Sequence, residues 1–272
     1  MVERGDGVYS LTDRGASVYL IRSGDEALLI DSGFDSTAAM ILAELHAMGV
    51  KRIARILLTH GHGDHYEGCA RIVRAFGSEV GIHPADARLI TETGDVVLYR
   101  ELNRSYPDLF PVPAEHQAAT ASSLDLTEGV VVRVGERRLR ALHTPGHSEG
   151  SVCLLEEERG LLFSGDAVSG DFVHFYCAPA VLEKTLGRIA FMPIARLLMA
   201  HAYPPEGASV LDGGRARRFV ERSAGALMQA RSRVANRLRE DPGITAQRLT
   251  EELHGPTLIA VIRMMEEARG GR

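Results

Sequence analysis

Along most of the chain, blocks of apolar residues are separated by short polar segments, and the spacing within the blocks predicts strands and helices in alternation. Short apolar or alternating runs predict strands at Val8–Leu11, Val18–Arg22, Ala27–Ile30, Ile53–Leu58, Val80–His83, Gly129–Val134, Arg137–His143, Ser151–Leu155, Gly160–Ser164 and Ala195–Ala200. Apolar residues at helical spacing predict helices at about Thr37–Met48, Tyr66–Phe76, Pro84–Thr91 and Ala180–Ala190. Ser36 is the expected N-cap of the first helix. This alternation is typical of the α/β class.

The pattern changes after Gly213-Gly214. From Arg215 to Arg272 the chain contains twelve arginines and seven acidic residues, so this part is basic whereas the whole chain has a net charge of -5. The spacing predicts three helices, at about Ala216–Arg239, Ile244–Leu253 with Thr245 as its cap, and Thr257–Ala268. We therefore expect one α/β domain at residues 1–212 and a small basic helical domain at residues 213–272.

The basic tail has two interpretations. A basic helix-turn-helix could contact nucleic acid. Alternatively, the helices could pack over one side of the α/β domain or form a homodimer interface. The second interpretation is favoured because most of the arginines lie along one long helix and no strand-rich wing follows it. Lys51 and Lys184 are the only lysines, so the arginine content can also reflect coding bias.

Residues 96–122 form a less regular stretch that contains Pro107, Pro111 and Pro113. A long irregular insertion in a compact domain is often a functional lid, although it can also simply wrap the surface. His116 is a candidate for the wall of a pocket there.

Composition narrows the class of protein. Hydrophobic residues make up 45% and charged residues 25% of 272 residues, as in ordinary soluble globular proteins. Residues 1–7 contain no apolar signal core, and no apolar run is long enough for a membrane span, so a cytoplasmic location is expected. The three cysteines have no metal-type spacing and are expected to be reduced packing residues, with Cys177 a candidate pocket residue.

Candidate metal ligands gather directly after a predicted strand. His60, His62, Asp64 and His65 fall within six positions, at the end of Ile53–Leu58. Gly61 and Gly63 allow the backbone to turn sharply there. Three imidazoles and a carboxylate suit zinc or a similar divalent ion. A histidine-rich surface loop that binds nothing is the alternative.

Further histidines and aspartates that could bind a metal lie at or just after the ends of other predicted strands. His147 follows the strand at Arg137–His143, Asp166 ends the apolar run that starts at Leu161, and His201 ends another. Asp31 closes Ala27–Ile30 in the same way. Because α/β proteins place their sites at the carboxyl ends of strands, this repetition favours one metal site over a chance cluster.

The spaced series resembles the metallo-β-lactamase superfamily, whose signature is a His-x-His-x-Asp-His loop followed by a histidine, an aspartate and a histidine at later strand ends. The resemblance covers roughly Val8–His201. It implies a four-layered αββα sandwich with two metal ions at one edge. The three predicted C-terminal helices are similar to the small winged-helix-like tail of some members.

The resemblance also implies a role for each ligand type. The ligands of one metal would be His60, His62 and His147. Those of the second would be Asp64, His65 and His201. Asp166 is similar to the carboxylate that bridges the two metals, and Asp31 to the aspartate that steadies the histidine loop.

A charge count indicates the chemistry of such a centre. Two divalent cations, two carboxylates and a bridging hydroxide leave a charge of about plus one, which attracts electron-rich oxygen. Metals of this kind polarise a carbonyl or phosphoryl oxygen and lower the pKa of water to about 7. Hydrolysis by a metal-bridging hydroxide is therefore expected, with Asp64 both binding metal and orienting the hydroxide. Zinc is the expected metal, and iron and manganese stay open because histidine and carboxylate accept all three.

Departures from known subfamilies narrow the substrate. Zinc β-lactamases that use a cysteine ligand would carry it where Asp166 stands, which argues against antibiotic hydrolysis. Asp166 is instead similar to the bridging residue of hydroxyacylglutathione hydrolases (glyoxalase II), acyl-homoserine lactonases and the RNase Z group. Iron-binding oxygen reductases of this fold carry a glutamate where His62 stands. We find no lysine and arginine cluster for glutathione in the tail, and no insertion of the tRNA-gripping type.

The sequence therefore predicts a dinuclear metallohydrolase that cleaves an ester, thioester or lactone of a small or carrier-bound acyl substrate. Candidate substrate-binding residues are Phe172, His174 and Tyr176, which follow Asp166 closely, although core packing is the alternative for each. The rival functions are nucleic-acid processing or binding through the basic tail, and a sensor that keeps the metals with vestigial turnover.

Overall fold

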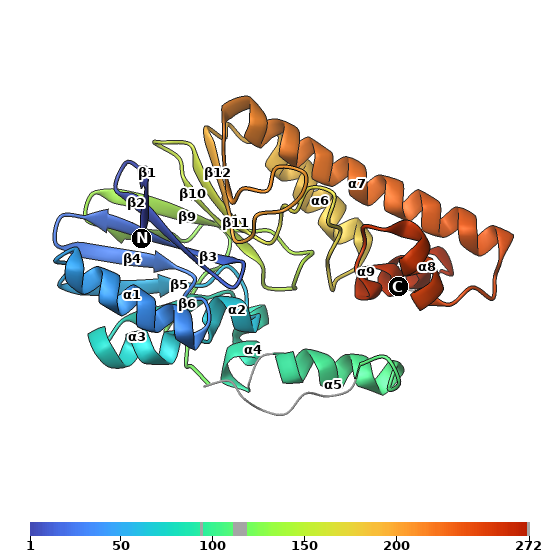
Figure 1. Cartoon of the computed structure of the whole chain (residues 1–272), viewed down its shortest axis with the longest axis horizontal. Coiled ribbons are helices and arrows are strands. Elements are labelled where there is room, and N and C mark those ends of the chain that lie inside the picture. The colour runs from blue at the N-terminus through green and yellow to red at the C-terminus, as the bar shows by residue number, and fades with distance from the viewer. Residues whose placement is uncertain (93–94, 111–118, 271–272) are drawn as a thin grey trace. The chain divides into compact units, whose positions relative to one another are not determined.

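The computed structural model describes residues 1–92, 95–110 and 119–270, and Figure 1 labels its elements where there is room. The chain forms two compact units. The first contains residues 1–143 and 154–157, and the second contains residues 144–153 and those from 158 onward. The domain boundary expected between residues 212 and 213 stays a prediction.

A seven-stranded sheet forms the centre of the first unit, with its strands in chain order. Its strands are β1 (Val2–Gly5), β2 (Val8–Asp13), β3 (Ala16–Ser23), β4 (Glu26–Ile30), β5 (Arg52–Leu57), β6 (Glu79–Ile82) and β7 (Leu124–Asp125). The pairs from β1 to β4 are antiparallel, and those from β4 to β7 are parallel. The parallel half therefore brings the carboxyl ends of β4, β5 and β6 to the same edge.

Turn chemistry explains the antiparallel half. Asp6-Gly7 and Arg14-Gly15 connect successive strands, and all four residues have φ between 51° and 88°. Two consecutive left-handed residues are what a type I′ hairpin turn requires. Beyond β4 the connections are longer and contain helices, which parallel pairing needs.

Helices α1 (Asp35–Ala47) and α3 (Cys69–Phe76) contribute Ile41, Leu45 and Ile72 to the buried core of this sheet. The expected cap of α1 was wrong, because the N-cap is Phe34 and Ser36 lies in the first turn. The Ser36 hydroxyl donates to the Asp13 carboxylate, 2.8 Å away on β2, instead of capping the helix.

The remaining elements of the first unit are α2 (Gly63–Tyr66), the 3₁₀ helix η1 (Pro84–Asp86), α4 (Ala87–Thr91), α5 (Asp95–Ser105), β8 (Val131–Val134) and β9 (Arg137–His143). The predicted hairpin at Gly135-Glu136 is confirmed by the antiparallel pairing of β8 with β9. Residues 96–122 were expected to be irregular, but the first part of this stretch is helical, since it belongs to α5 as far as Ser105. His116, Pro111 and Pro113 lie outside the described residues.

A buried ion pair links β9 to β10 (Val152–Glu156) inside the first unit. The Arg137 guanidinium donates to both carboxylate oxygens of Glu156, at 2.9 and 2.5 Å. It also donates to the backbone carbonyl of Asp6 at 2.7 Å. The side chain of Glu156 is fully buried and that of Arg137 is 6% exposed, so neither charge has water to replace its partner.

The second sheet runs in the order β13-β12-β11-β10-β9-β8, and β10 contributes residues to both units. The elements of the second unit are β11 (Leu161–Gly165), α6 (Pro179–Ala190), β12 (Arg196–Met199), β13 (Val210–Asp212), α7 (Gly213–Glu240), α8 (Ala246–Leu253) and α9 (Leu258–Ala268). The three C-terminal helices match the prediction, and Thr245 caps α8 by accepting a hydrogen bond from the Arg248 amide. No helix in the described ranges combines the length and hydropathy needed to cross a bilayer.

Arginines of α7 are paired with carboxylates of the same unit. Arg222 contacts Asp171 at 2.5 Å, and Arg237 contacts Glu252 of α8 at 2.9 Å. Arg231 contacts Glu267 of α9 at 3.0 Å and also pairs with Glu183 of α6. These pairs attach α7 to its neighbours and balance part of its positive charge within the unit.

Candidate metal centre

The histidine loop leaves β5 at its carboxyl end. Gly61 packs so closely that an added Cβ would lie 2.6 Å from the side chain of Leu89, and its amide donates to Asp86 at 3.1 Å. Glycine is therefore favoured here by packing, and the turn itself does not require it because Gly61 is not in the left-handed φ region. These contacts hold the loop between β5 and α4.

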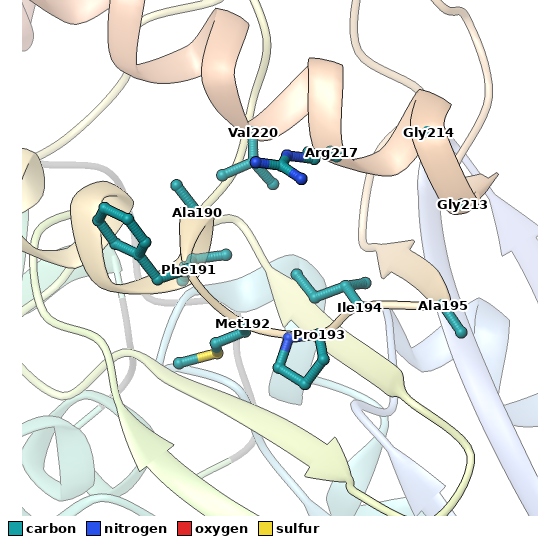
Figure 2. A pocket seen from close by; sticks show the side chains of 11 residues that line it. Ala190, Phe191, Met192, Pro193, Ile194, Ala195, Gly213, Gly214, Arg217 and Val220 are labelled. Atoms are coloured by element: carbon teal, nitrogen blue, oxygen red, sulfur yellow. The ribbon is translucent and has the colours of Figure 1, made fainter.

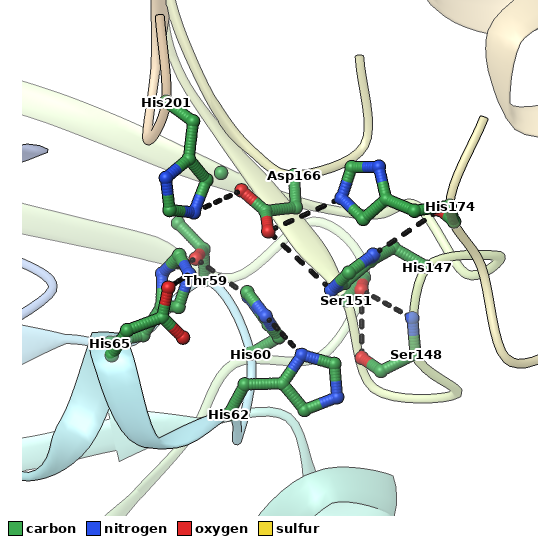
Figure 3. Close-up of polar contacts among 12 residues, drawn as sticks. Thr59, His60, His62, His65, His147, Ser148, Ser151, Asp166, His174 and His201 are labelled. Atoms are coloured by element: carbon green, nitrogen blue, oxygen red, sulfur yellow. Dashed lines mark hydrogen bonds and ion pairs between the residues drawn. The ribbon is translucent and has the colours of Figure 1, made fainter. Parts of the chain in front are cut away.

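Imidazoles of this loop lie close together. The His60 Nε2 and His62 Nδ1 atoms are 2.9 Å apart, and the His60 and His65 ring centroids are 3.9 Å apart (Figure 3). Asp64 places Oδ2 3.6 Å from His65 Nε2. His60 and His65 are 1% exposed, whereas the Asp64 side chain is 28% exposed. The four predicted ligands of the first unit therefore form one compact group.

Asp31, which follows β4, is hydrogen-bonded to this group. Its carboxylate accepts hydrogen bonds from the Thr59 amide at 2.8 Å and from His65 Nδ1 at 2.9 Å. The Thr59 hydroxyl also donates to it, at 2.9 Å. With Nδ1 donating, His65 keeps Nε2 as the nitrogen that can bind metal.

In the second unit His147 sits in a fixed turn. An added Cβ at Gly146 would lie 2.8 Å from Leu182 of α6, and Thr185 of the same helix donates to the Pro145 carbonyl at 2.6 Å. His147 Nδ1 donates to the backbone carbonyl of His174 at 3.4 Å. Its Nε2 faces Asp166 Oδ2 at 3.6 Å. The carbonyl therefore selects the tautomer in which Nε2 carries the lone pair.

Asp166 follows β11 and lies between histidines on different elements (Figure 3). Its Oδ2 atom faces His147, and its Oδ1 atom lies 3.5 Å from Nε2 of His201, which follows β12. Asp166 is 7% exposed. The two oxygens of one buried carboxylate thus face two different imidazoles.

His174 also contacts Asp166, with its Nε2 atom 3.4 Å from Oδ2. Its Nδ1 atom donates to the Phe172 carbonyl at 3.2 Å, and the Tyr203 hydroxyl lies 3.0 Å from Nε2. Tyr176 packs edge-on against His147, with ring centroids 5.5 Å apart. Two of the candidate substrate-binding residues, His174 and Tyr176, therefore border Asp166 and His147, whereas Phe172 lies beside His174. Tyr203 was missed, although its place two residues after His201 could have suggested it.

The donor atoms fit a divalent metal. Imidazole nitrogen and carboxylate oxygen are the ligands that zinc, iron and manganese accept. Within the second unit, one ligand atom from each of His147, Asp166 and His174 lies within 4.8 Å of the others, and all three residues are buried. Buried carboxylates and imidazoles at this spacing are typical of metal sites.

A separate cavity of about 670 Å³ lies between the end of α6 and the start of α7 (Figure 2). Phe191, Met192 and Ile194 line it, together with Arg217. It borders Ala195, which precedes β12, whereas His201 follows that strand. This cavity is thus at the other end of β12 from the candidate ligand.

Comparison with known proteins identifies a family. The model of the metallo-beta-lactamase superfamily matches residues 11–207. An atrochrysone carboxyl ACP thioesterase of Aspergillus fumigatus is 29% identical over 97% of this chain and 59% of its own length. The human acyl-coenzyme A thioesterase MBLAC2 is 28% identical over 60% of this chain and 64% of its own length. The chain thus spans about three fifths of the length of these two relatives.

Solved structures show the same fold. A metallo-beta-lactamase family protein of Thermus thermophilus superposes with a TM-score of 0.76 at 20% identity, over 97% of this chain and 93% of its own. A subclass B3 metallo-beta-lactamase of Bradyrhizobium japonicum gives 0.65 at 22% identity, over 84% and 92%. The fold class expected from the sequence is confirmed.

Proposed function

The chain belongs to the metallo-beta-lactamase superfamily, and from this premise we propose that it is a metal-dependent hydrolase of acyl thioesters, small or carrier-bound. The observation that carries the proposal is the group of buried imidazoles and carboxylates at strand ends. The two thioesterase relatives described above support the choice of a thioester over an ester or lactone.

We propose two metal positions. His60, His62 and His147 would hold one ion, and Asp64, His65 and His201 the other. Asp166 would contact both, an assignment supported by the way its two oxygens face His147 and His201. Zinc is the proposed metal. Ions bound there would supply Lewis acidity and a nucleophilic water at neutral pH.

The chain's own residues would divide the remaining work. Asp64 would orient the attacking water, because its carboxylate is the most accessible of the proposed ligand carboxylates. Phe172 is 40% exposed and lies beside His174, with ring centroids 5.1 Å apart, so it offers an apolar surface to an acyl chain. Asp31 and the His174 carbonyl would keep His65 and His147 in their metal-binding tautomers.

A substrate screen tests the proposal. Metal-free protein is loaded with Zn²⁺, Mn²⁺ or Fe²⁺ and supplied with acyl-coenzyme A, an acylated carrier protein, lactones and phosphodiesters. We expect metal-dependent release of free thiol. His62→Ala and Asp166→Ala should reduce hydrolysis to background while the circular dichroism spectrum stays that of a folded chain.

Matched controls are His46→Ala and Asp25→Ala, which remove an exposed imidazole and an exposed carboxylate. Both controls should retain full turnover. Full turnover in either His62→Ala or Asp166→Ala would contradict the role of that residue. Faster cleavage of phosphodiesters than of thioesters would support the nucleic-acid-processing alternative, and retention on heparin at low salt would test its binding form.

A cytoplasmic location is also proposed. All three cysteines are thiols in the structure, as is usual in a reducing compartment.

A further inference from the structure

The segment 171–177, which follows the loop after Asp166, is hydrogen-bonded to the turn that carries His147. The Tyr176 amide donates to the carbonyl of His147 at 3.1 Å, and the Cys177 amide donates to the carbonyl of Gly146 at 3.2 Å. In return, His147 Nδ1 donates to the His174 carbonyl. The orientation of the His147 ring therefore depends on where this segment lies.

Helix α9 holds the same segment from its other side. The Thr257 amide, at the N-cap of α9, donates to the Val173 carbonyl at 2.9 Å. The Arg263 Nε atom, one and a half turns further along, donates to the Tyr176 carbonyl at 2.9 Å. The peptide groups of Val173 and Tyr176 are thus fixed by donors that lie more than 80 positions away in the sequence.

We propose that α9 is a positioning element of the metal centre, acting through residues 173–176 on His147. Arg263 is the central residue of this link, because Tyr176 contacts both sides. The Tyr176 carbonyl accepts a hydrogen bond from Arg263, and the Tyr176 amide donates one to the backbone carbonyl of His147. The inference rests on the proposed role of His147 as a metal ligand. It gives the C-terminal helices a role in metal binding that is independent of nucleic acid.

Arginine suits this position for a geometric reason. Its NH1 atom pairs with Glu266 one turn further along α9 at 3.0 Å, which holds the guanidinium plane while Nε reaches Tyr176. The Arg263 side chain is 35% exposed, so its removal should not open the core. Loss of the donor would instead let the Tyr176 peptide move, and with it the carbonyl that fixes the His147 tautomer.

The test measures Zn²⁺ affinity by competition with a chelating indicator, using full-length protein. Arg263→Met keeps the length of the side chain and removes its donors. Arg263→Lys restores one donor. Arg231→Met is the matched control, because Arg231 joins α7 to Glu267 of α9 and contacts none of residues 171–177 in the described structure.

We expect Arg263→Met to weaken Zn²⁺ binding about tenfold, the lower end of the effect of outer-shell partners on metal affinity. Arg263→Lys should recover part of the loss, and Arg231→Met should bind Zn²⁺ as the wild type does. With Co²⁺ as a probe, the visible absorption bands should change in Arg263→Met alone.

Wild-type affinity in Arg263→Met, or an equal loss in Arg231→Met, would overturn the inference. The assay needs no acyl substrate, so its outcome is separate from that of the proposed function. A wild-type protein that binds Zn²⁺ but hydrolyses no thioester would refute the thioesterase proposal alone. A wild-type protein that binds none of Zn²⁺, Mn²⁺ and Fe²⁺ would refute both.

Discussion

Asp31 and His65 lie 34 positions apart and share a hydrogen bond of 2.9 Å between Oδ2 and Nδ1, with both side chains at most 3% exposed. Asp31 occupies the left-handed region, with φ of 60°, because the chain turns there out of β4. That turn points the carboxylate at Thr59 and His65. Asp31 thus connects the backbone of Thr59, just before the histidine loop, to the imidazole of His65 at the end of that loop.

Asp31→Asn tests this connection. Asparagine tolerates the left-handed conformation. Its side chain, however, has one carbonyl oxygen and one NH₂ group, and the NH₂ group cannot accept the hydrogen bonds that Thr59 and His65 donate. We expect Zn²⁺ affinity to fall by about 10- to 100-fold and the free energy of unfolding to fall by about 1–3 kcal/mol. Indicator competition and urea unfolding measure the two effects.

Asp6→Asn is the control, because Asp6 is an exposed turn residue with nearly the same φ, 56°. It should change neither quantity. Unaltered Zn²⁺ affinity in Asp31→Asn would show that Asp31 has no influence on the metal centre.

Glu156→Gln tests the buried ion pair with Arg137. The substitution keeps the shape of the side chain but leaves the guanidinium without a counter-charge in the interior. We expect the free energy of unfolding to fall by about 3–5 kcal/mol. Glu157→Gln breaks the neighbouring ion pair with Arg140, in which the Glu157 and Arg140 side chains are 57% and 40% exposed. It should lower the free energy of unfolding far less, because solvent screens an exposed pair. Equal losses in urea unfolding would argue against the role of burial.

His83 gives a pH-dependent prediction. Burial lowers the pKa of His83 below its ordinary value of 6.5, and the stacked ring of His143 lowers it further, against the opposing charges of Asp86 and Asp125. Below pH 6.5 the unfolded chain therefore binds this proton more readily than the folded chain does, and stability is lost as the pH falls.

In the wild type, Nδ1 of the His83 ring accepts a hydrogen bond from the Ala85 amide at 3.2 Å. His83→Asn removes the titrating imidazole and keeps a side-chain acceptor for this amide. Relative to this variant, the wild type should lose stability as the pH falls through 6.5. Urea unfolding at several pH values measures the difference. His46→Asn, at an exposed site on α1, is the control, and parallel pH curves for wild type and His83→Asn would refute the prediction.

The thiols should differ in reactivity. Burial raises the pKa of both Cys69 and Cys153 to about 12, so almost no thiolate forms at pH 8. Cys177 is only half-buried. A disulfide reagent should therefore modify Cys177 first and the other two only after unfolding. Cys177→Ser should remove the first phase, and a persistent fast phase would mean that a core thiol is accessible.

Much of the fold could be predicted from local patterns. Most of the predicted strands and helices and the cap Thr245 depend on residues close in sequence, and the structure places them near where the pattern indicated. The sequence alone also groups the four candidate ligands of the histidine loop. The metal roles of these residues stay predictions.

Three of the errors and omissions share a cause, which is contact between residues far apart in sequence. Ser36 turned away from its helix because Asp13, on another strand, accepts its hydroxyl. Tyr203 became a site residue because it reaches His174, 29 positions earlier. The bond from Arg263 to Tyr176 spans 87 positions and has no local signal.

The match to the family model ends at residue 207, whereas the donors to Val173 and Tyr176 are at positions 257 and 263. A shortened chain that ends at residue 207 would retain every proposed metal ligand. It would lack the Thr257 amide and the Arg263 side chain, which hold residues 173–176 beside His147. Poor yield or weak metal retention in such a fragment would then reflect the trimming itself.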